Sequence, residues 1–203
     1  MKCIIIGAGV FSETMVQKDP GDFLICADGG YKAAVSLNLD IDLLVGDFDS
    51  LEKVPDDLPK IQVNPIKDDT DGFLAISEGL KRGYKDFILY GFLGGRIEHS
   101  IANIQHLAYL KNLNVKSIMI DGKTKIFMLK DNESYIIKKE NIGYISVFSY
   151  SPKLLLSITG LKYNLDRKEI TYLFPLGIDN EEIGLDGYIQ IHEGLALIIE
   201  TLK

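Results

Sequence analysis

Cysteine is scarce in this sequence of 203 residues, which holds only Cys3 and Cys26. Each lies inside a short apolar run, so we expect two small buried hydrophobic side chains rather than a disulfide framework. No apolar run approaches the ~20 residues that a membrane-spanning helix needs, and the opening residues show no signal peptide. We therefore expect a protein of the reducing cytoplasm with no membrane partner.

Positive charge is in short supply as well. The chain has 22 lysine and arginine residues against 29 aspartate and glutamate residues, which gives a formal net charge of -7. A field of this sign does not attract nucleic acid, so we expect no nucleic-acid partner. It also repels the phosphates of ATP unless a cation lies between the protein and the nucleotide.

Apolar side chains are plentiful, at 46% of the residues, and can build a buried core. In the first part of the chain, short apolar runs alternate with segments of helical periodicity, which predicts a mostly parallel sheet covered by helices. The expected strands are 2–6, 22–27, 43–45, 86–90 and 117–120. The expected helices are 30–37, 71–82 and 98–110, the last with a core-facing stripe of Ile101, Ile104, Leu107 and Ala108.

After about Asp121 the helical periodicity fades, and short runs rich in Ile, Val, Tyr, Phe and Leu take its place. Gly, Asn, Asp and Pro separate these runs, a pattern that indicates a small antiparallel sandwich or barrel. The expected strands are 135–137, 144–148, 154–158, 170–174, 188–192 and 196–199. With a boundary near 122–124, we expect an α/β domain over 1–122 and a β domain over 123–203.

Two glycine-containing turns follow the first two expected strands. Gly7–Gly9 is similar to the start of a dinucleotide-binding fingerprint, although Ser12 stands where the third glycine would be. Asp28–Gly30 has an aspartate before two glycines, which is a common turn. Each segment is compatible with a simple chain reversal and with close approach of a nucleotide to the backbone.

The segment Gly46–Ser50, Gly-Asp-Phe-Asp-Ser, follows an apolar strand. If the chain stays extended here, the side chains of Asp47 and Asp49 point to the same side. Magnesium is often held by one or two carboxylates together with phosphate oxygens and water, so the pair suits this metal. Taken alone, the segment is equally compatible with an aspartate-rich turn in which Asp49 or Ser50 serves as a cap.

A second acidic segment, Lys67–Asp71, precedes a helical pattern and reads Lys-Asp-Asp-Thr-Asp. A threonine or aspartate at a helix start is an ordinary N-cap, and acids are favoured there by the helix dipole. This explanation accounts for one or two of the acids but does not need three. Lys67 supplies a cation suited to phosphate.

The segment Gly94–His99 reads Gly-Gly-Arg-Ile-Glu-His between an expected strand and an expected helix. Backbone N–H groups at the helix start and the guanidinium of Arg96 can converge on a phosphate there. The alternative is a flexible loop in which Glu98 caps the helix and His99 is simply buried and satisfied.

The combination of these loops favours a ligand site. Loops that follow the strands of an open α/β sheet share one edge of it, where ligands bind. Unpaired acids gathered at that edge repel one another, and a divalent metal relieves the repulsion.

In order and context, the segments Asp28–Gly30, Gly46–Ser50, Lys67–Asp71 and Gly94–His99 resemble those of thiamine pyrophosphokinases. The resemblance covers nearly the whole chain, including Gly160–Leu165 and the final hairpin with Gly194. It implies an N-terminal three-layer α/β domain with a mostly parallel sheet and a C-terminal antiparallel β-sandwich. It also implies transfer of the pyrophosphoryl group of ATP to the hydroxyl of thiamine, with AMP as the second product.

The resemblance assigns roles to particular residues. It implies that Mg²⁺ is held by Asp47, Asp49 and Asp71, and that Arg96 lies near the phosphates as a fourth catalytic residue. It implies an ATP site formed by Asp28, Gly29, Gly30, Lys67, Thr70, Gly94, Gly95 and Arg96. Thiamine contacts are expected from Glu98, His99, Asp179 and Asn180, the last two in a loop between strands.

The sequence departs from the family pattern in three places. Glu98 stands where an aspartate is usual after Gly-Gly-Arg, Asp179 stands where a serine is usual, and the chain has no tryptophan. The departures leave the metal chemistry intact and concern how thiamine is recognised. Because thiamine is a cation, an acidic pocket suits it, and Tyr163 or Tyr172 can add a cation–π contact.

Two other functions remain open at this point. A related pyrophosphokinase acting on a pterin alcohol would share the metal acids and differ in the acceptor pocket. A nucleotide-binding or metal-sensing module would bind ATP without releasing AMP. The family resemblance further implies a homodimer, in which the first domain of one subunit and the second domain of its partner share a site.

Overall fold

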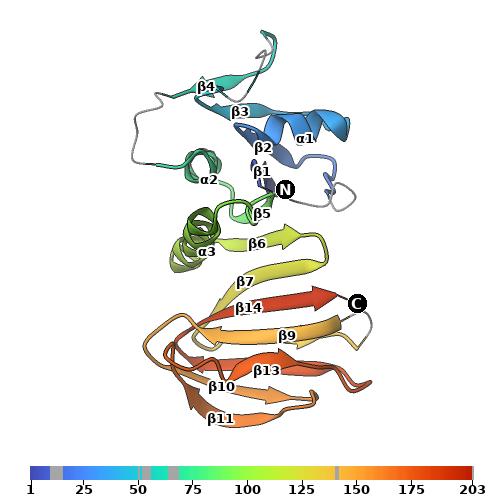
Figure 1. Cartoon of the computed structure of the whole chain (residues 1–203), viewed down its shortest axis with the longest axis vertical. Helices are drawn as coiled ribbons and strands as arrows, with labels where there is room; N and C mark the ends of the chain where they lie inside the picture. Colours follow the sequence, from blue (N-terminus) through green and yellow to red (C-terminus); the bar gives the residue numbers. More distant parts are fainter. Residues whose placement is uncertain (10–15, 50, 52–55, 64–68, 140–141, 203) are drawn as a thin grey trace. The chain divides into compact units, whose positions relative to one another are not determined.

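The computed structural model describes residues 1–203 except 10–15, 50, 52–55, 64–68, 140–141 and 203. Contacts within the chain divide it into two compact units, Met1–Gly122 and Lys123–Lys203. Figure 1 shows helices and strands in the first unit and strands in the second. None of the helices among the described residues is long and apolar enough to cross a membrane.

The first unit is built on parallel strands. Their order in the sheet is β6-β5-β1-β2-β3-β4, and each neighbouring pair is parallel. The strands are β1 (Cys3–Ile6), β2 (Phe23–Ala27), β3 (Leu43–Gly46), β4 (Lys60–Gln62), β5 (Asp86–Tyr90) and β6 (Lys116–Asp121). The central strands are buried along their whole length, as expected for a parallel sheet covered on both faces.

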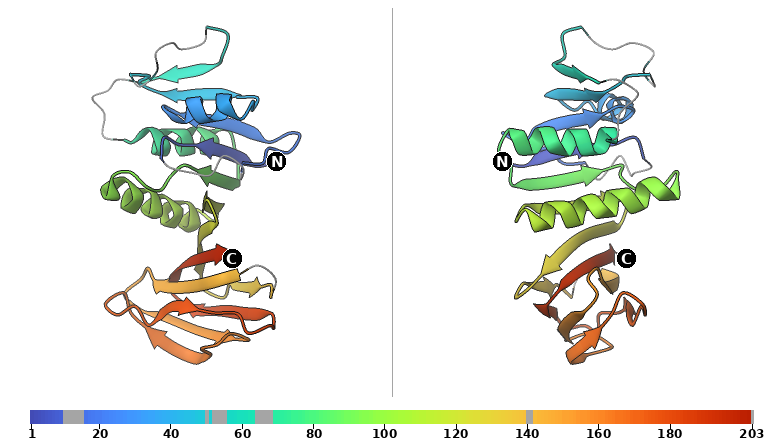
Figure 2. Two further views of the ribbon diagram at one scale, coloured as in Figure 1. Left: turned by 45° about the vertical axis from the view of Figure 1, so that its right-hand side comes forward. Right: turned by 90° about the vertical axis from the view of Figure 1, so that its left-hand side faces the viewer.

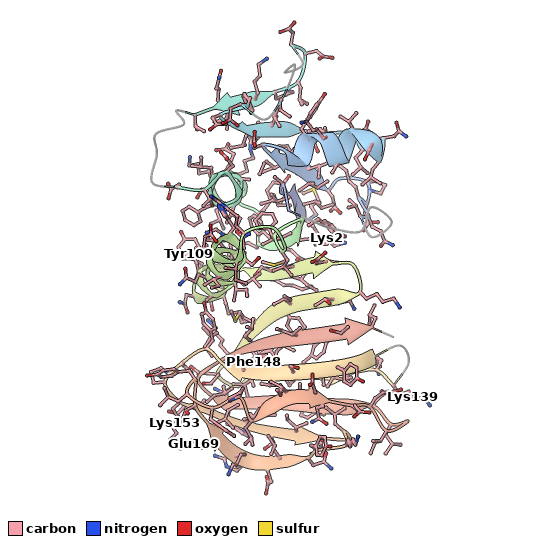
Figure 3. All side chains as sticks on the ribbon, in the orientation of Figure 1. Lys2, Tyr109, Lys139, Phe148, Lys153 and Glu169 are labelled. Carbon is pink, nitrogen blue, oxygen red and sulfur yellow. The ribbon has the colours of Figure 1, made fainter. Side chains whose placement is uncertain are left out.

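Helices cover the two faces of this sheet, as Figure 2 shows: α1 (Gly30–Ser36) on one, α2 (Asp71–Lys81) and α3 (Ile97–Asn112) on the other. Alternate residues of a strand point to opposite faces. Ile4 and Ile6 accordingly share a buried cluster with Ala34 of α1. On the other face, Gly79 of α2 lies so close to Phe87 and Cys3 that a β-carbon would come within 3 Å of each. Tyr109 of α3, labelled in Figure 3, packs its ring edge against Phe73 of α2.

The second unit consists of antiparallel strands in two groups, ordered β12-β9-β14-β7 and β11-β10-β13-β8. Side chains from both groups share one buried cluster, so the groups pack face to face around a common core. The strands are β7 (Thr124–Lys130), β8 (Ser134–Ile137), β9 (Ile142–Ser149), β10 (Leu154–Thr159), β11 (Leu165–Ile170), β12 (Gly177–Asn180), β13 (Gly187–Glu193) and β14 (Leu195–Leu202).

The structure confirms the predicted combination of parallel strands, a few helices and antiparallel strands, and it corrects details. The strand expected at 170–174 is wrong, because β11 ends at Ile170 and the side chains of Tyr172 to Phe174 are exposed. The true strand was missed because its middle residues, 166–169, are all charged and exposed, as suits a strand at the sheet edge. Strands β4, β7 and β12 were also missed.

The expected core-facing stripe of α3 is only half right. Leu107 and Ala108 are buried, but 54% of Ile101 is exposed. Ile101 lies seven residues before Ala108 and therefore on the same side of the helix. The buried residues of α3 are confined to its second half, so the same apolar stripe is uncovered in the first half.

Candidate active site

Three carboxylates meet where β2 and β3 end. Asp28 directly follows β2, and Asp47 and Asp49 follow β3. Each offers an oxygen atom, and these three atoms all lie within 4.8 Å of one another. The two strands are parallel neighbours, so their carboxyl ends open on the same edge of the sheet.

The backbone around this cluster is unusual. Asp28 and Phe48 both have left-handed conformations, with φ of 44° and 65°. The condition for Asp47 and Asp49 to point to the same side, an extended chain, is therefore not met: the chain turns at Phe48 between them. Gly46 is needed for the approach of the two loops, since a β-carbon there would lie 3.2 Å from Cα of Asp28.

The cluster is electrostatically unsatisfied. The neighbouring Asp47 carboxylate, followed by burial and by Asp28, raises the pKa of Asp49 above its ordinary value. Asp28 Oδ1 is buried and has no hydrogen-bond partner among the described residues. Carboxylate oxygens at this spacing are the hard ligands that a divalent cation such as Mg²⁺ takes, so the donor set fits such an ion.

A cavity of about 370 Å³ lies beside the cluster, and Asp28 belongs to both. Its walls come from the end of β2, from the loops after β1, β2 and β5, from the start of α2 and from the first two turns of α3. The lining residues are Gly7, Ala8, Gly9, Ala27, Asp28, Thr70, Asp71, Gly72, Gly91, Phe92, Leu93, Gly94, Gly95, Arg96, His99 and Asn103. All of them belong to the first unit.

Glycine allows the walls to approach each other. The Gly9 N–H donates to the carbonyl of Gly91 over 2.8 Å, and a β-carbon on Gly9 would lie 2.5 Å from the carbonyl oxygen of Leu93. The buried Phe92 ring likewise fills the space that a β-carbon on Gly72 would need. The Gly7–Gly9 segment therefore holds the loop after β5 in place, in addition to lining the cavity.

The start of α2 supplies one further predicted acid. Thr70 is the N-cap, and its hydroxyl accepts a hydrogen bond from the Phe73 N–H at 3.2 Å. Asp71 follows in the first turn and lines the cavity. It contributes to the raised pKa of Asp49 but is not part of the close three-carboxylate cluster. Lys67 lies outside the described residues.

The loop before α3 brings a cation and a histidine to the cavity. Gly94 and Gly95 have φ of 79° and 65°, which glycine adopts without strain. The guanidinium of Arg96 pairs with Glu98 at 3.2 Å and contacts Nε2 of His99. Arg96 and His99 line the cavity, whereas Glu98 is not among the described lining residues and serves as the partner of Arg96.

Two predicted ATP contacts lie at the start of α1, and one of them, Gly30, has a packing role. Gly29 and Gly30 begin α1 and are absent from the described lining of the cavity. A β-carbon on Gly30 would overlap the carbonyl oxygen of Ile6, so this glycine lets the helix approach the strand.

In the second unit, Asp179 and Asn180 do not lie in the expected loop but in β12. The register of β12 with β9 shifts between Gly177 and Asn180, and Asp179 has a φ of 54°, so the strand is irregular here. Asn180 is buried, and its amide exchanges two hydrogen bonds, of 2.9 and 2.7 Å, with the backbone of Tyr163. The amide therefore holds the loop that presents Tyr163, while Asp179 is exposed.

Two functional residues were not recognised in the roles that the structure suggests. Asp28 was expected as an ATP contact, yet it also completes the acid cluster. The signal for this role is the parallel pairing of β2 and β3, which places the residues that follow the two strands at the same edge of the sheet. Asn103 was not singled out, although it follows His99 by four residues on the same helix face. Its amide donates to the carbonyl of Phe92 over 2.6 Å and so ties α3 to the cavity wall.

A parallel α/β sheet with clustered acids and a glycine-lined cavity at the carboxyl ends of its strands is typical of α/β proteins that bind a ligand at this edge of the sheet. Comparison with known proteins agrees and narrows the class. The family described as "Thiamin pyrophosphokinase, catalytic domain" matches residues 17–119. The curated thiamine pyrophosphokinase of Bacillus subtilis (strain 168) is 33% identical over 163 residues, covering 77% of this chain and 76% of that protein.

Solved structures give the same answer. The crystal structure of thiamine pyrophosphokinase from Bacillus subtilis superposes with a TM-score of 0.90 at 28% identity, covering all of both chains. That of Geobacillus thermodenitrificans shares the fold, with a TM-score of 0.86 at 23% identity over 99% of this chain and 97% of the other. The chain belongs to the thiamine pyrophosphokinase family, and it is an enzyme.

Proposed function

We propose that this chain transfers the pyrophosphoryl group of ATP to the hydroxyl of thiamine and releases AMP. The thiamine oxygen forms a bond to the β-phosphorus, the bond from that phosphorus to the oxygen bridging to AMP breaks, and the hydroxyl proton leaves to solvent. Membership of the family supports the reaction. The observation that carries it is the unsatisfied cluster of Asp28, Asp47 and Asp49 beside the cavity.

The acids are proposed to hold Mg²⁺, through Asp47, Asp49 and Asp71 together with Asp28. Bound there, the ion would neutralise the charge of the phosphates, which a chain of net charge -7 otherwise repels. The mutual repulsion that raises the pKa of Asp49 supports this assignment, because a cation removes it.

The phosphates are proposed to lie against the loop before α3, with Thr70, Gly94 and Gly95 at the cavity wall. Arg96 and His99 supply hydrogen-bond donors for the oxygens of the transferred group, where negative charge develops during the reaction. The guanidinium pairs with Glu98 at 3.2 Å through side chains that are both largely exposed, so it is accessible to a phosphate. Lys67 is proposed as a further phosphate contact.

Thiamine recognition is proposed to use the second unit. Tyr163 is 58% exposed, and its backbone is fixed by the buried Asn180. An aromatic face held in this way can stack on a cationic ring. The exposed carboxylate of Asp179 adds a charge opposite to that of thiamine.

The active form is proposed to be a homodimer. The second unit exposes a set of large apolar side chains, which a second copy of the chain would cover. They are Tyr172, Leu173, Phe174, Leu176, Ile178, Ile183 and Leu185.

A mixture of the Asp49→Asn variant with the double variant Asp179→Ala/Tyr163→Ala tests whether the two subunits share their active sites. If they do, one of the two sites of a mixed dimer carries neither defect. Activity should return to about half that of wild type per mixed dimer; no recovery despite confirmed exchange would contradict shared sites.

A cytoplasmic location is proposed because both cysteines are free thiols, as is usual in a reducing compartment. Burial raises the pKa of both Cys3 and Cys26 to about 12, so neither is a reactive thiolate, and both are free.

The direct test incubates the protein with ATP, Mg²⁺ and thiamine and measures AMP and thiamine pyrophosphate in equal amounts. Omission of the metal and the Asp49→Asn variant are the controls. Product from a pterin alcohol but not from thiamine would favour the related pyrophosphokinase. Tight ATP binding without AMP would indicate a binding module and overturn the proposal.

A further inference from the structure

Phe48 is an aromatic residue in a conformation that aromatic residues rarely adopt. Its φ is 65°, in the left-handed region, where a side chain crowds the backbone. Asparagine, aspartate and glycine tolerate this region far better. Such strain persists only where the surroundings enforce it, and it concentrates at functional sites.

The enforcing contact is burial of the Phe48 ring. Only 7% of the residue is exposed, and the ring belongs to the apolar cluster formed by β1, β2, β3 and α1. Among its members are Cys26 of β2, Ala34 of α1 and Leu44 of β3. The apolar surface removed from water stabilises the ring in place and offsets the cost of the left-handed backbone.

The ring and the two flanking acids are coupled through the turn. The Asp49 N–H donates to Oδ1 of Asp47 over 3.1 Å, and the Leu51 N–H donates to the carbonyl of Phe48 over 3.2 Å. With the ring fixed in the core, the carboxylates of Asp47 and Asp49 remain close to each other and to Asp28 despite their repulsion. Without the anchor, that repulsion would drive the acids apart.

We propose that Phe48 is a positioning residue that sets the spacing of the Asp47 and Asp49 carboxylates and thereby the affinity of the site for a divalent cation. The inference rests on the cation site of the proposed function. It assigns the ring a role beyond core packing, because the ring acts on the acids through the strained turn.

Three substitutions separate the anchor from the strain. Phe48→Leu keeps an apolar side chain in the core. Phe48→Gly removes the anchor and the strain together, and Phe48→Ala removes the anchor but keeps the strain. Binding of Mn²⁺, measured by electron paramagnetic resonance without nucleotide or thiamine, reports the site independently of turnover. Urea unfolding of each variant shows whether it is folded under the binding conditions.

We expect Phe48→Leu to bind Mn²⁺ within about threefold of wild type and Phe48→Gly to bind at least about tenfold more weakly, a loss of ~1.4 kcal/mol. The apparent Mg²⁺ requirement for AMP release should rise in parallel, with kcat at saturating Mg²⁺ changed less. If Phe48→Ala does not fold, the difference in Mn²⁺ affinity between Phe48→Leu and Phe48→Gly still tests the role of the buried ring.

Wild-type affinity in a folded Phe48→Gly would overturn the inference, as would an equal loss in the leucine variant. No saturable Mn²⁺ binding by the wild type would overturn it as well, because the acids would then not form a site before ATP arrives. If the wild type binds Mn²⁺ but releases no AMP with thiamine, the proposed function fails while the role of Phe48 stands.

Discussion

Each unit has an acid with a buried carboxylate oxygen, and the two acids differ in whether this oxygen has a hydrogen-bond partner. In the second unit, Glu200 of β14 is 2% exposed, and both of its carboxylate oxygens are bonded. Tyr135 donates to one over 2.5 Å, and Lys125 donates to the other over 3.3 Å. In the first unit, Oδ1 of Asp28 has no partner among the described residues and faces two further acids. We interpret the satisfied carboxylate of Glu200 as part of the fold and the unsatisfied oxygen of Asp28, which faces two further acids, as part of a ligand site.

The surroundings of Glu200 show how a structural network is made. Burial, and then the hydrogen bond to Glu200, raises the pKa of Tyr135 far above its ordinary value, so the phenol stays a donor at neutral pH. The Tyr135 ring also packs on Phe127, with centroids 4.7 Å apart. Every polar atom of this network therefore has a partner inside the unit, which leaves nothing for a ligand to complete.

The largest expected effect comes from Asp49→Asn. If the cluster holds the metal, this change should lower kcat by about 10²–10³-fold, the scale seen when one group that stabilises transition-state charge is removed. Without metal, the folded protein should be no less stable than wild type, because a repulsive charge beside Asp47 is gone. Product assays and urea unfolding of the same preparation measure both quantities. A folded variant with near-normal turnover would remove Asp49 from the proposed site.

Glu200→Gln should give the opposite result. It removes a charge-assisted hydrogen bond and leaves Lys125 without its partner, so we expect a loss of about 2 kcal/mol in the free energy of unfolding. Mn²⁺ binding should not change. Tyr135→Phe is the matched control, since it deletes the hydroxyl that donates to the same carboxylate and should likewise cost about 2 kcal/mol. If either change weakened Mn²⁺ binding, the separation between a structural acid and a ligand-binding acid would be wrong.

Arg96→Lys tests the cavity wall next to the acids. The change keeps the charge but loses the planar fork that contacts Glu98 and His99. We expect KM for ATP to rise about tenfold, the scale of one charge-assisted hydrogen bond, and KM for thiamine to change much less. Initial rates with each substrate varied in turn give both constants. An effect confined to the KM for thiamine would show that Arg96 is not a phosphate ligand.

Much of the first unit was predictable because its signals are local. The strand at 86–90 was predicted with its observed bounds, since a short, largely apolar run between Lys85 and Gly91 leaves little choice. The acids at positions 47 and 49 were singled out from their place after such a strand, and the family resemblance assigned them to the metal. The left-handed turn at Phe48 was not predicted, because the backbone conformation of this residue depends on where its ring packs in the folded protein. Strand β11 was missed for a related reason: its charged residues carry no apolar alternation.

The smallest expected effect concerns His106, the other unpartnered buried group described in the first unit. Its Nδ1 is buried without a hydrogen-bond partner among the described residues, and its ring packs on Phe73 with centroids 5.1 Å apart. Burial lowers the pKa of His106, an effect that the charge of Asp69 opposes in part. His106 is not among the described residues that line the cavity, so it tests whether an unpartnered group can be merely structural.

Because the folded-state pKa of His106 lies below the unfolded value of about 6.5, the unfolded chain binds the proton first as the pH falls. The contribution of the neutral ring to stability is thus complete above pH ~6.5 and declines below it, by at most about 1.4 kcal/mol per pH unit for one proton. Urea unfolding of wild type and His106→Gln between about pH 7.5 and 5.5 should show the steeper decline in wild type. Since the acids at 28, 47 and 49 are present in both proteins, their titration cancels in the difference. Equal slopes would show that folding does not lower the pKa of His106, and a shallower decline in wild type would indicate an interaction at Nδ1 that favours the protonated ring.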